Sequence, residues 1–203
     1  MTLQVGQCGN QIGRAFWSLA LEEHARYSPD GLFDESMSSF FRNVDSRFDA
    51  ELPFQNGRHE IKCLRARAIL VDMEEGPVAE TLRYALFWYT HGRGPIGELF
   101  DARQLITDVS GSGNNWAHGH ALYGPKYREA LLEQLHHVTE QCDSLQSFFL
   151  LHSLGGGTGS GLGTYILGLL QDHFPHVYRF VTAVFPSPDD DVVTSRTWWA
   201  LKL

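Results

Sequence analysis

The sequence has 203 residues, of which 43% are hydrophobic, and its formal net charge at pH 7 is −8. These values predict one domain with a sizeable core and argue against a protein that binds nucleic acid or a membrane surface through a basic patch. No apolar run reaches the ~20 residues of a membrane span, no secretory signal is evident, and the three scattered cysteines fit a reducing compartment.

The chain is expected to begin with a short strand, residues 2–5, a polar glycine-bearing turn, residues 6–11, and a helix, residues 12–24. One face of that helix is expected to be apolar, formed by Ile12, Phe16, Leu19 and Ala20. Residues 27–54 are mixed. Four aromatic side chains in this stretch are expected to cover a core: Phe33, Phe40, Phe41 and Phe48.

The next strand, residues 67–71, is of the fully buried kind and ends at Asp72, with Glu74 and Glu75 close behind. In open α/β sheets, ligands bind at the carboxyl ends of the strands. Carboxylates beside phosphates make sense there if Mg²⁺ lies between them. Taken alone, these carboxylates are more typical of a solvated acidic turn.

The middle of the chain is expected to hold an aromatic-ended helix, residues 78–90, a glycine-and-polar loop, residues 108–116, and an amphipathic helix, residues 127–142. Gly92, Gly94 and Gly97 match a dinucleotide-binding spacing by letter, but they follow a helix rather than a strand. We therefore interpret that match as coincidence.

A glycine-rich stretch, residues 153–161, follows an apolar strand, residues 147–151, and precedes a helix, residues 162–173. Successive N–H groups and the N-terminus of a helix form an anion-binding concavity, so this layout favours phosphate binding. Neither the Lys-Ser/Thr pair of a Walker loop nor a Gly-x-Gly-x-x-Gly pattern is present in it. A flexible linker is disfavoured because the flanking segments are apolar. The last strand, residues 178–185, leads to an acidic run.

Alternating strands and helices predict the α/β class, as a Rossmann-like, mostly parallel sheet with helices on both faces. Every distinctive polar loop follows the carboxyl end of a strand, so these loops are expected to gather along one edge of the sheet. They would hold a phosphate ligand by backbone dipoles and a metal ion rather than by a basic patch.

Three of these loops, residues 6–11, 111–116 and 155–161, resemble the nucleotide loops of the tubulin family, in tubulin order. Residues 38–45 resemble the epsilon branch of the family more than the alpha or beta branches, as do residues 73–76 and 105–108. The resemblance runs to about Ser195. It implies a tubulin/FtsZ-type GTPase domain over residues 1–195, incomplete at its C-terminal end, and a divergent tail over residues 196–203.

The resemblance also implies residue roles, with GTP and Mg²⁺ as ligands. Gln7 and Cys8 would contact the nucleotide near the base and phosphates, and Gly113 and Asn114 would lie against the terminal phosphate. The phosphates would be cradled by Ser153, Gly157, Thr158 and Gly159. Asp191 would approach the ribose, and Glu74, with Asp72 nearby, would hold Mg²⁺. No catalytic residue is assigned.

Three departures from the family pattern carry further expectations. The first strand is short, so its pairing is expected to be weak, and residues 84–93 look like an insertion. The family's guanine-reading asparagines and hydrolysis-activating acid are expected beyond Leu203. The chain alone is therefore expected to bind GTP weakly and to lack appreciable GTPase activity, and its last strand is expected to leave an unpaired, apolar edge.

For the complete protein, the resemblance implies a cytoskeletal role in microtubule organisation at centrioles, basal bodies and the centrosome, within the cytoplasm. The implied partners are other tubulins and centriole components, not nucleic acid or membrane. Two alternatives stay open. One is a non-functional or dominant-negative truncated product with weak phosphate binding. The other is a dinucleotide-binding oxidoreductase, disfavoured because residues 6–11 lack the required glycine fingerprint.

Overall fold

A computed structural model describes residues 1–27, 35–45, 47–48, 50–53, 61–90 and 99–187, with the backbone alone for residues 83–90. Its main sheet has five strands, all parallel to their neighbours, in the order β6-β5-β1-β7-β8. The strands are β1 (Thr2–Val5), β5 (Ala68–Asp72), β6 (Leu105–Thr107), β7 (Ser147–Ser153) and β8 (Tyr178–Val184).

Strand β1 lies at the centre of this sheet. Thr2 is paired with Ala68 of β5 on one side and with Phe149 of β7 on the other, and all four residues of the strand are buried. The expected weak pairing of β1 is therefore wrong. Its backbone N–H and C=O groups find hydrogen-bond partners in two neighbouring strands, so the pairing of β1 does not depend on its length alone.

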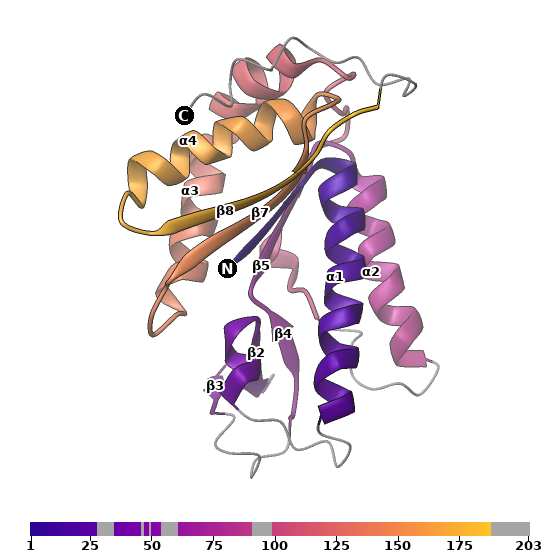
Figure 1. Ribbon diagram of the computed structural model, residues 1–203, viewed down its shortest axis with the longest axis vertical. Coiled ribbons are helices and arrows are strands. Elements are labelled where there is room, and N and C mark those ends of the chain that lie inside the picture. The colour runs from indigo at the N-terminus through magenta and orange to yellow at the C-terminus, as the bar shows by residue number, and fades with distance from the viewer. Residues whose placement is uncertain (28–34, 46, 49, 54–60, 91–98, 188–203) are drawn as a thin grey trace.

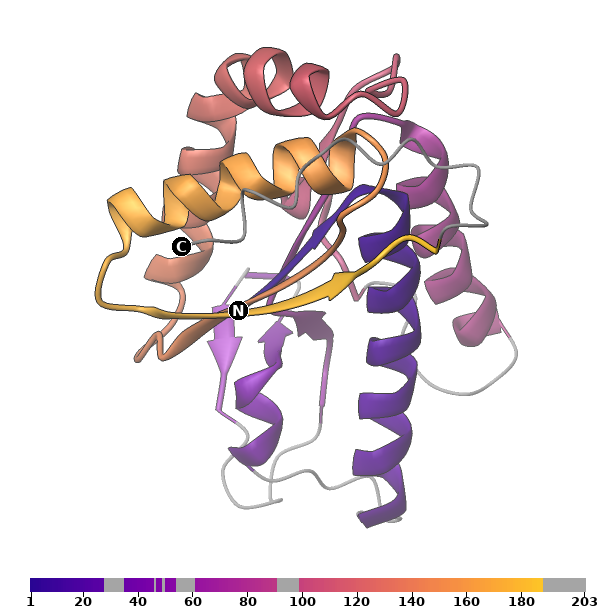
Figure 2. The ribbon, with the colours of Figure 1, turned by 45° about the horizontal axis from the view of Figure 1, so that its top comes forward.

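Helices cover both faces of the sheet, which confirms the predicted fold class (Figures 1 and 2). Helices α1 (Gly6–Tyr27) and α2 (Glu75–Thr90) lie on one face, and α3 (Gly124–Glu140) and α4 (Gly163–His173) lie on the other. Alternate residues of β5 separate the two cores: Leu70 packs with Trp17 of α1, whereas Val71 packs with Leu131 of α3. The fully buried character expected of β5 is confirmed.

Helix α1 begins at Gly6, so the predicted turn over residues 6–11 is its first part. Of the residues predicted for its apolar face, Phe16 and Ala20 pack against the core, whereas Leu19 does not. Trp17 and Gly13 are buried, whereas the Leu19 side chain is 56% exposed. The helix approaches the sheet through glycines, and a search for apolar residues does not detect such a face.

A second sheet, antiparallel and ordered β3-β2-β4, was not predicted, and its strands β2 and β3 lie in the mixed stretch, residues 27–54. It consists of β2 (Phe41–Asp45), β3 (Ala50–Leu52) and β4 (Leu64–Ala66), and η1 (Glu35–Ser39) precedes it. Phe41 is buried and Phe40 packs against the core, as expected, but Phe48 is 75% exposed, so its predicted role is wrong. Phe33 lies outside the described residues.

Arg67 joins this small sheet to the rest of the fold. Because its removal would leave several of its partners without a hydrogen bond, we expect Arg67→Ala to lower the free energy of unfolding by about 2–4 kcal/mol. Its guanidinium donates to Ser38 O at 2.9 Å and Gln141 O at 3.1 Å, and it pairs with Glu51 at 2.8 Å. The side chain is only 11% exposed. The measurement is urea unfolding.

The matched control is Arg26→Ala, which removes a 4.0 Å pair with Glu22 from a side chain that is 77% exposed. Surface pairs of this kind contribute about 0–1 kcal/mol. Equal losses of stability in the two variants would contradict the assigned role of Arg67.

Two further expectations concern the ends of elements. Helix α2 continues to Thr90, so residues 84–90 of the proposed insertion extend a helix, and residues 91–98 lie outside the described part. Strand β8 is an edge strand of the described sheet, and the Tyr178 and Phe180 side chains on it are 75% and 59% exposed. The expected apolar edge is therefore confirmed for the described residues.

Among the residues that the structure describes, no helix has the length and apolar character to cross a bilayer.

Candidate nucleotide site

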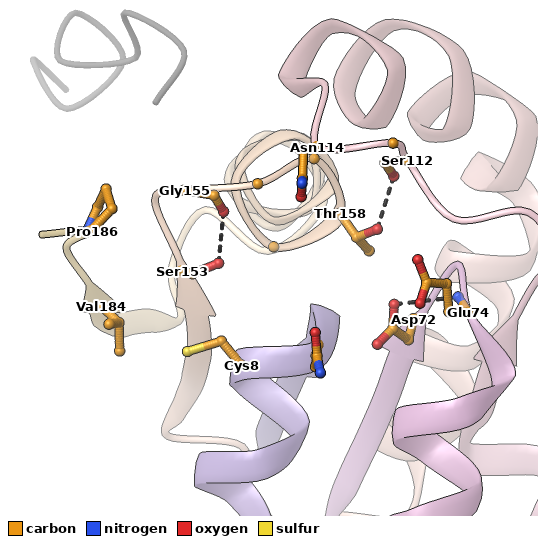
Figure 3. Close-up of a pocket in the computed structure, with 15 residues that line it drawn as sticks. Cys8, Asp72, Glu74, Ser112, Asn114, Ser153, Gly155, Thr158, Val184 and Pro186 are labelled. Atoms are coloured by element: carbon orange, nitrogen blue, oxygen red, sulfur yellow. Dashed lines mark hydrogen bonds between the residues drawn. The ribbon is translucent and has the colours of Figure 1, made fainter. Parts of the chain in front are cut away.

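A cavity of about 350 Å³ opens at the carboxyl ends of the central strands. Strand β1 leads directly into α1 on one face of the sheet, and the loop after β7 leads to α4 on the other face. Such a divergence opens a crevice between neighbouring parallel strands, where α/β proteins bind ligands. The lining residues, drawn in Figure 3, are Gln7, Cys8, Asp72, Glu74, Ser112, Gly113, Asn114, Ser153, Gly155, Gly156, Gly157, Thr158, Gly159, Val184 and Pro186.

The start of α1 forms one wall and carries Gln7 and Cys8 into the cavity. Gly6 has φ 74°, and a Cβ on it would lie 2.7 Å from Gly159 N, so glycine is required for the two loops to approach this closely. The N–H groups of the first helical turn have no partners within the helix, which favours an anion in front of them. Burial raises the pKa of the Cys8 thiol, so Cys8 stays protonated rather than acting as a thiolate.

The glycine loop after β7 forms the opposite wall and leads through η6 (Thr158–Leu162) into α4. Two hydroxyls brace it from within: Ser153 Oγ donates to Gly155 O at 2.8 Å, and Ser160 Oγ donates to Gly156 O at 2.5 Å. His152 lies beneath the loop, 1% exposed, with Nδ1 2.9 Å from Gly159 O. Burial lowers the His152 pKa, so the ring is neutral and Nδ1–H is the donor.

Two carboxylates lie at the end of β5. Asp72 is 3% exposed, its Oδ1 accepts from Glu74 N at 3.3 Å, and its Oδ2 has no hydrogen-bond partner among the described residues. Burial is the main cause that raises the Asp72 pKa to about 7. An unpartnered buried carboxylate oxygen beside an exposed second carboxylate suits a divalent cation.

The loop after β6 closes the cavity over these carboxylates. Gly111 N donates to Met73 O at 2.7 Å, and Tyr123 Oη donates to Gly111 O at 2.9 Å. Gly113 and Asn114 both have φ 55°, which turns the loop over the cavity. The Asn114 side chain projects toward the glycine loop (Figure 3).

Ten of the eleven residues predicted for the site line this one cavity. The exception is Asp191, which lies outside the described residues, as does the predicted domain boundary at Ser195. The expected gathering of the loops at one edge of the sheet is therefore confirmed, while the individual ligand contacts stay predictions. Sequence reasoning did not select five lining residues: Ser112, Gly155, Gly156, Val184 and Pro186.

The five residues that were not predicted differ in how well the sequence indicates them. Ser112, Gly155 and Gly156 lie inside loops that were already singled out. Val184 and Pro186 follow from position, because β8 ends at the same edge of the sheet as β7. They are apolar and have no polar chemistry that a motif search would detect.

The lining combines backbone N–H groups, hydroxyls, amides and two carboxylates, and none of its described side chains is Lys or Arg. In the part of the chain that the structure describes, no group of three or more His, Cys, Asp or Glu residues forms a ready-made metal site. A cation at Asp72 and Glu74 would therefore need oxygens from a ligand or from water. A Mg²⁺-bound polyphosphate supplies them and also suits the N–H groups.

Comparison with known proteins points to the same class of ligand. A profile of the "Tubulin/FtsZ family, GTPase domain" matches residues 1–203. The chain is 57% identical to the tubulin epsilon chain of Mus musculus and 53% identical to that of Homo sapiens, in each case over 96% of this chain and 39% of the relative. It is 36% identical to the tubulin beta-8 chain of Oryza sativa subsp. japonica, over 92% of this chain and 37% of that relative.

Proposed function

Because this chain belongs to the tubulin/FtsZ family and matches its GTPase domain, with the epsilon chains among its relatives, we propose that the cavity binds GTP together with Mg²⁺. The chain spans 39% of the length of those epsilon relatives, so the activity of a whole protein is part of the proposal. The observation that carries it is the meeting of three glycine-bearing loops and a buried carboxylate around one cavity.

The residues divide by ligand chemistry. The N–H groups at the start of α1 and in the glycine loop, with the Thr158 hydroxyl, would bind the phosphates, and Gly113 and Asn114 would face the terminal phosphate. Glu74 and Asp72 would hold Mg²⁺, directly or through water. That cation would neutralise phosphate charge, which is needed where no basic side chain lines the described cavity.

Calorimetry with GTP, GDP and ATP, each with Mg²⁺ and with EDTA, tests the binding. We expect weak binding that depends on Mg²⁺ and on the phosphates, with little preference for guanine, and no appreciable hydrolysis by this chain alone. Glu74→Gln should weaken Mg²⁺-dependent GTP binding by about tenfold.

The matched control is Glu75→Gln, which changes the adjacent exposed carboxylate that is not part of the cavity lining. It should leave the affinity within about twofold, since the exposed Glu75 carboxylate does not line the cavity and would contact neither the cation nor the phosphates. Tight binding with strong guanine preference would contradict the expected weak binding, and equal effects of the two variants would contradict the Mg²⁺ assignment.

We further propose, from the epsilon relatives, a role in microtubule organisation at centrioles and basal bodies, with other tubulins as partners. A tagged protein should co-localise with centriole markers and co-sediment with tubulin. The alternative of a phosphate-binding product without cytoskeletal function predicts the same calorimetry but neither of these associations.

A further inference from the structure

Two loops of the cavity are joined by a hydrogen bond between side-chain hydroxyls. Ser112 Oγ lies 2.8 Å from Thr158 Oγ1, and Figure 3 shows this bond crossing from the loop after β6 to the loop after β7. Ser112 is buried, with 4% of its surface exposed, whereas Thr158 is partly exposed. No other hydrogen bond involves either side chain among the described residues. The pair is thus a direct polar link between two phosphate-facing segments.

Burial decides which hydroxyl donates. Each hydroxyl has one proton and can accept two hydrogen bonds. Thr158 is the more exposed of the two, so its proton reaches an acceptor in the cavity more readily than the proton of Ser112 does. We infer that Ser112 donates to Thr158. The Thr158 proton then stays free for an acceptor in the cavity, and the bond that Thr158 accepts makes it a stronger donor.

The backbones of the two loops are in contact around this bond. A Cβ placed on Gly157 would lie 2.5 Å from Ser112 Cβ and 2.8 Å from Asn115 N. A Cβ on Gly156 would lie 3.6 Å from Asn114 Oδ1. A displacement of one loop therefore displaces the other, because close-packed backbones have no room to move independently.

We propose that Ser112 is a positioning residue for the phosphates. It aims the Thr158 proton into the cavity and couples the loop of Gly113 and Asn114 to the glycine loop. This inference rests on the proposed nucleotide binding. Since Gly113 and Asn114 are expected to face the terminal phosphate, loss of the coupling weakens binding of a triphosphate more than binding of a diphosphate.

A double-mutant cycle on this chain tests the coupling, with calorimetry of Mg²⁺-GTP and Mg²⁺-GDP. Ser112→Ala and Thr158→Val should each weaken GTP binding by about 3- to 10-fold. The double variant should be no more than about twofold weaker than the worse single variant, because both changes remove the same bond. Ser112→Ala should change GDP affinity by less than about twofold, and Thr158→Ser, which keeps the hydroxyl, should bind GTP more tightly than Thr158→Val.

The matched control is Ser18→Ala, which removes a hydroxyl that bonds Arg14 O on α1 and does not line the cavity. Thermal unfolding without ligand shows whether Ser112→Ala merely destabilises the fold, and a midpoint close to that of the unmodified chain supports the positioning role. Equal nucleotide affinity of Ser112→Ala and the unmodified chain, or fully additive effects in the cycle, would overturn the inference while leaving the proposed function intact. Absence of nucleotide binding by the unmodified chain would overturn the proposed function, and this inference with it.

Discussion

The Gly6→Ala substitution is expected to abolish measurable nucleotide binding and to lower the free energy of unfolding by about 2–4 kcal/mol. Two independent effects add at this position. The φ of 74° is a left-handed conformation that disfavours any side chain, and the new Cβ would lie 2.7 Å from Gly159 N and 3.0 Å from Gly159 Cα. Both contacts are with backbone, so no side chain can rotate away to relieve them.

Relief requires the start of α1 to move away from the glycine loop, which separates Gln7 and Cys8 from the residues they face across the cavity. Urea unfolding and calorimetry with Mg²⁺-GTP measure the two effects. Gly168→Ala is the matched control, since a Cβ there meets nothing within 4 Å and the position is inside α4. It should raise stability by up to about 1 kcal/mol. Unchanged binding in Gly6→Ala would show that the contact between the two loops is dispensable.

The second large effect concerns Asp72, whose folded-state pKa is raised to about 7 by burial, against about 3.9 in an unfolded chain. Between these values the folded state keeps a proton that the unfolded state has lost, so stability falls as pH rises through this window. We expect the metal-free Asp72→Asn variant to match the unmodified chain near pH 4 and to be more stable by about 2–4 kcal/mol at pH 8.

Urea unfolding of both proteins at several pH values gives this difference directly. The comparison is needed because buried His152 acts in the opposite direction: its lowered pKa removes stability as pH falls below about 6.5. His152 is the same in both proteins, so its contribution cancels. Asp72→Asn should also lose Mg²⁺-dependent nucleotide binding. The buried carboxylate would then lower the stability of the free protein while it contributes to the affinity for the ligand. A pH-independent stability difference would contradict the raised pKa.

The site could be predicted from the sequence largely because its signals are local. Each of the three cavity-lining segments combines glycines with polar side chains within a few residues, and the α/β alternation places the ends of parallel strands at one edge. Ser112 was not selected because its proposed role depends on a hydrogen-bond partner 46 positions along the chain, and no local pattern reports that contact.

The errors in the fold have related causes. The buried face of α1 contains Gly9 and Gly13, and a Cβ on Gly9 would clash with Leu151 O, so the helix packs by close backbone approach as well as through Phe16 and Trp17. Hydrophobic periodicity therefore selected Leu19 in place of Trp17. The small antiparallel sheet was missed because its strands are only three to five residues long and their pairing is set by tertiary contacts.

The central position of β1 also has a consequence for how the chain is made. Of the five strands in the described sheet, β1 is synthesised before the others, but one of its two hydrogen-bonded neighbours, β7, is completed only at Ser153. Most of the described chain must therefore emerge before the middle of the sheet can close, and closing it requires contacts between distant parts of the sequence, which fold slowly. Until then the edge of β1 that β7 will cover stays open, which is the period when a chaperone would protect it best.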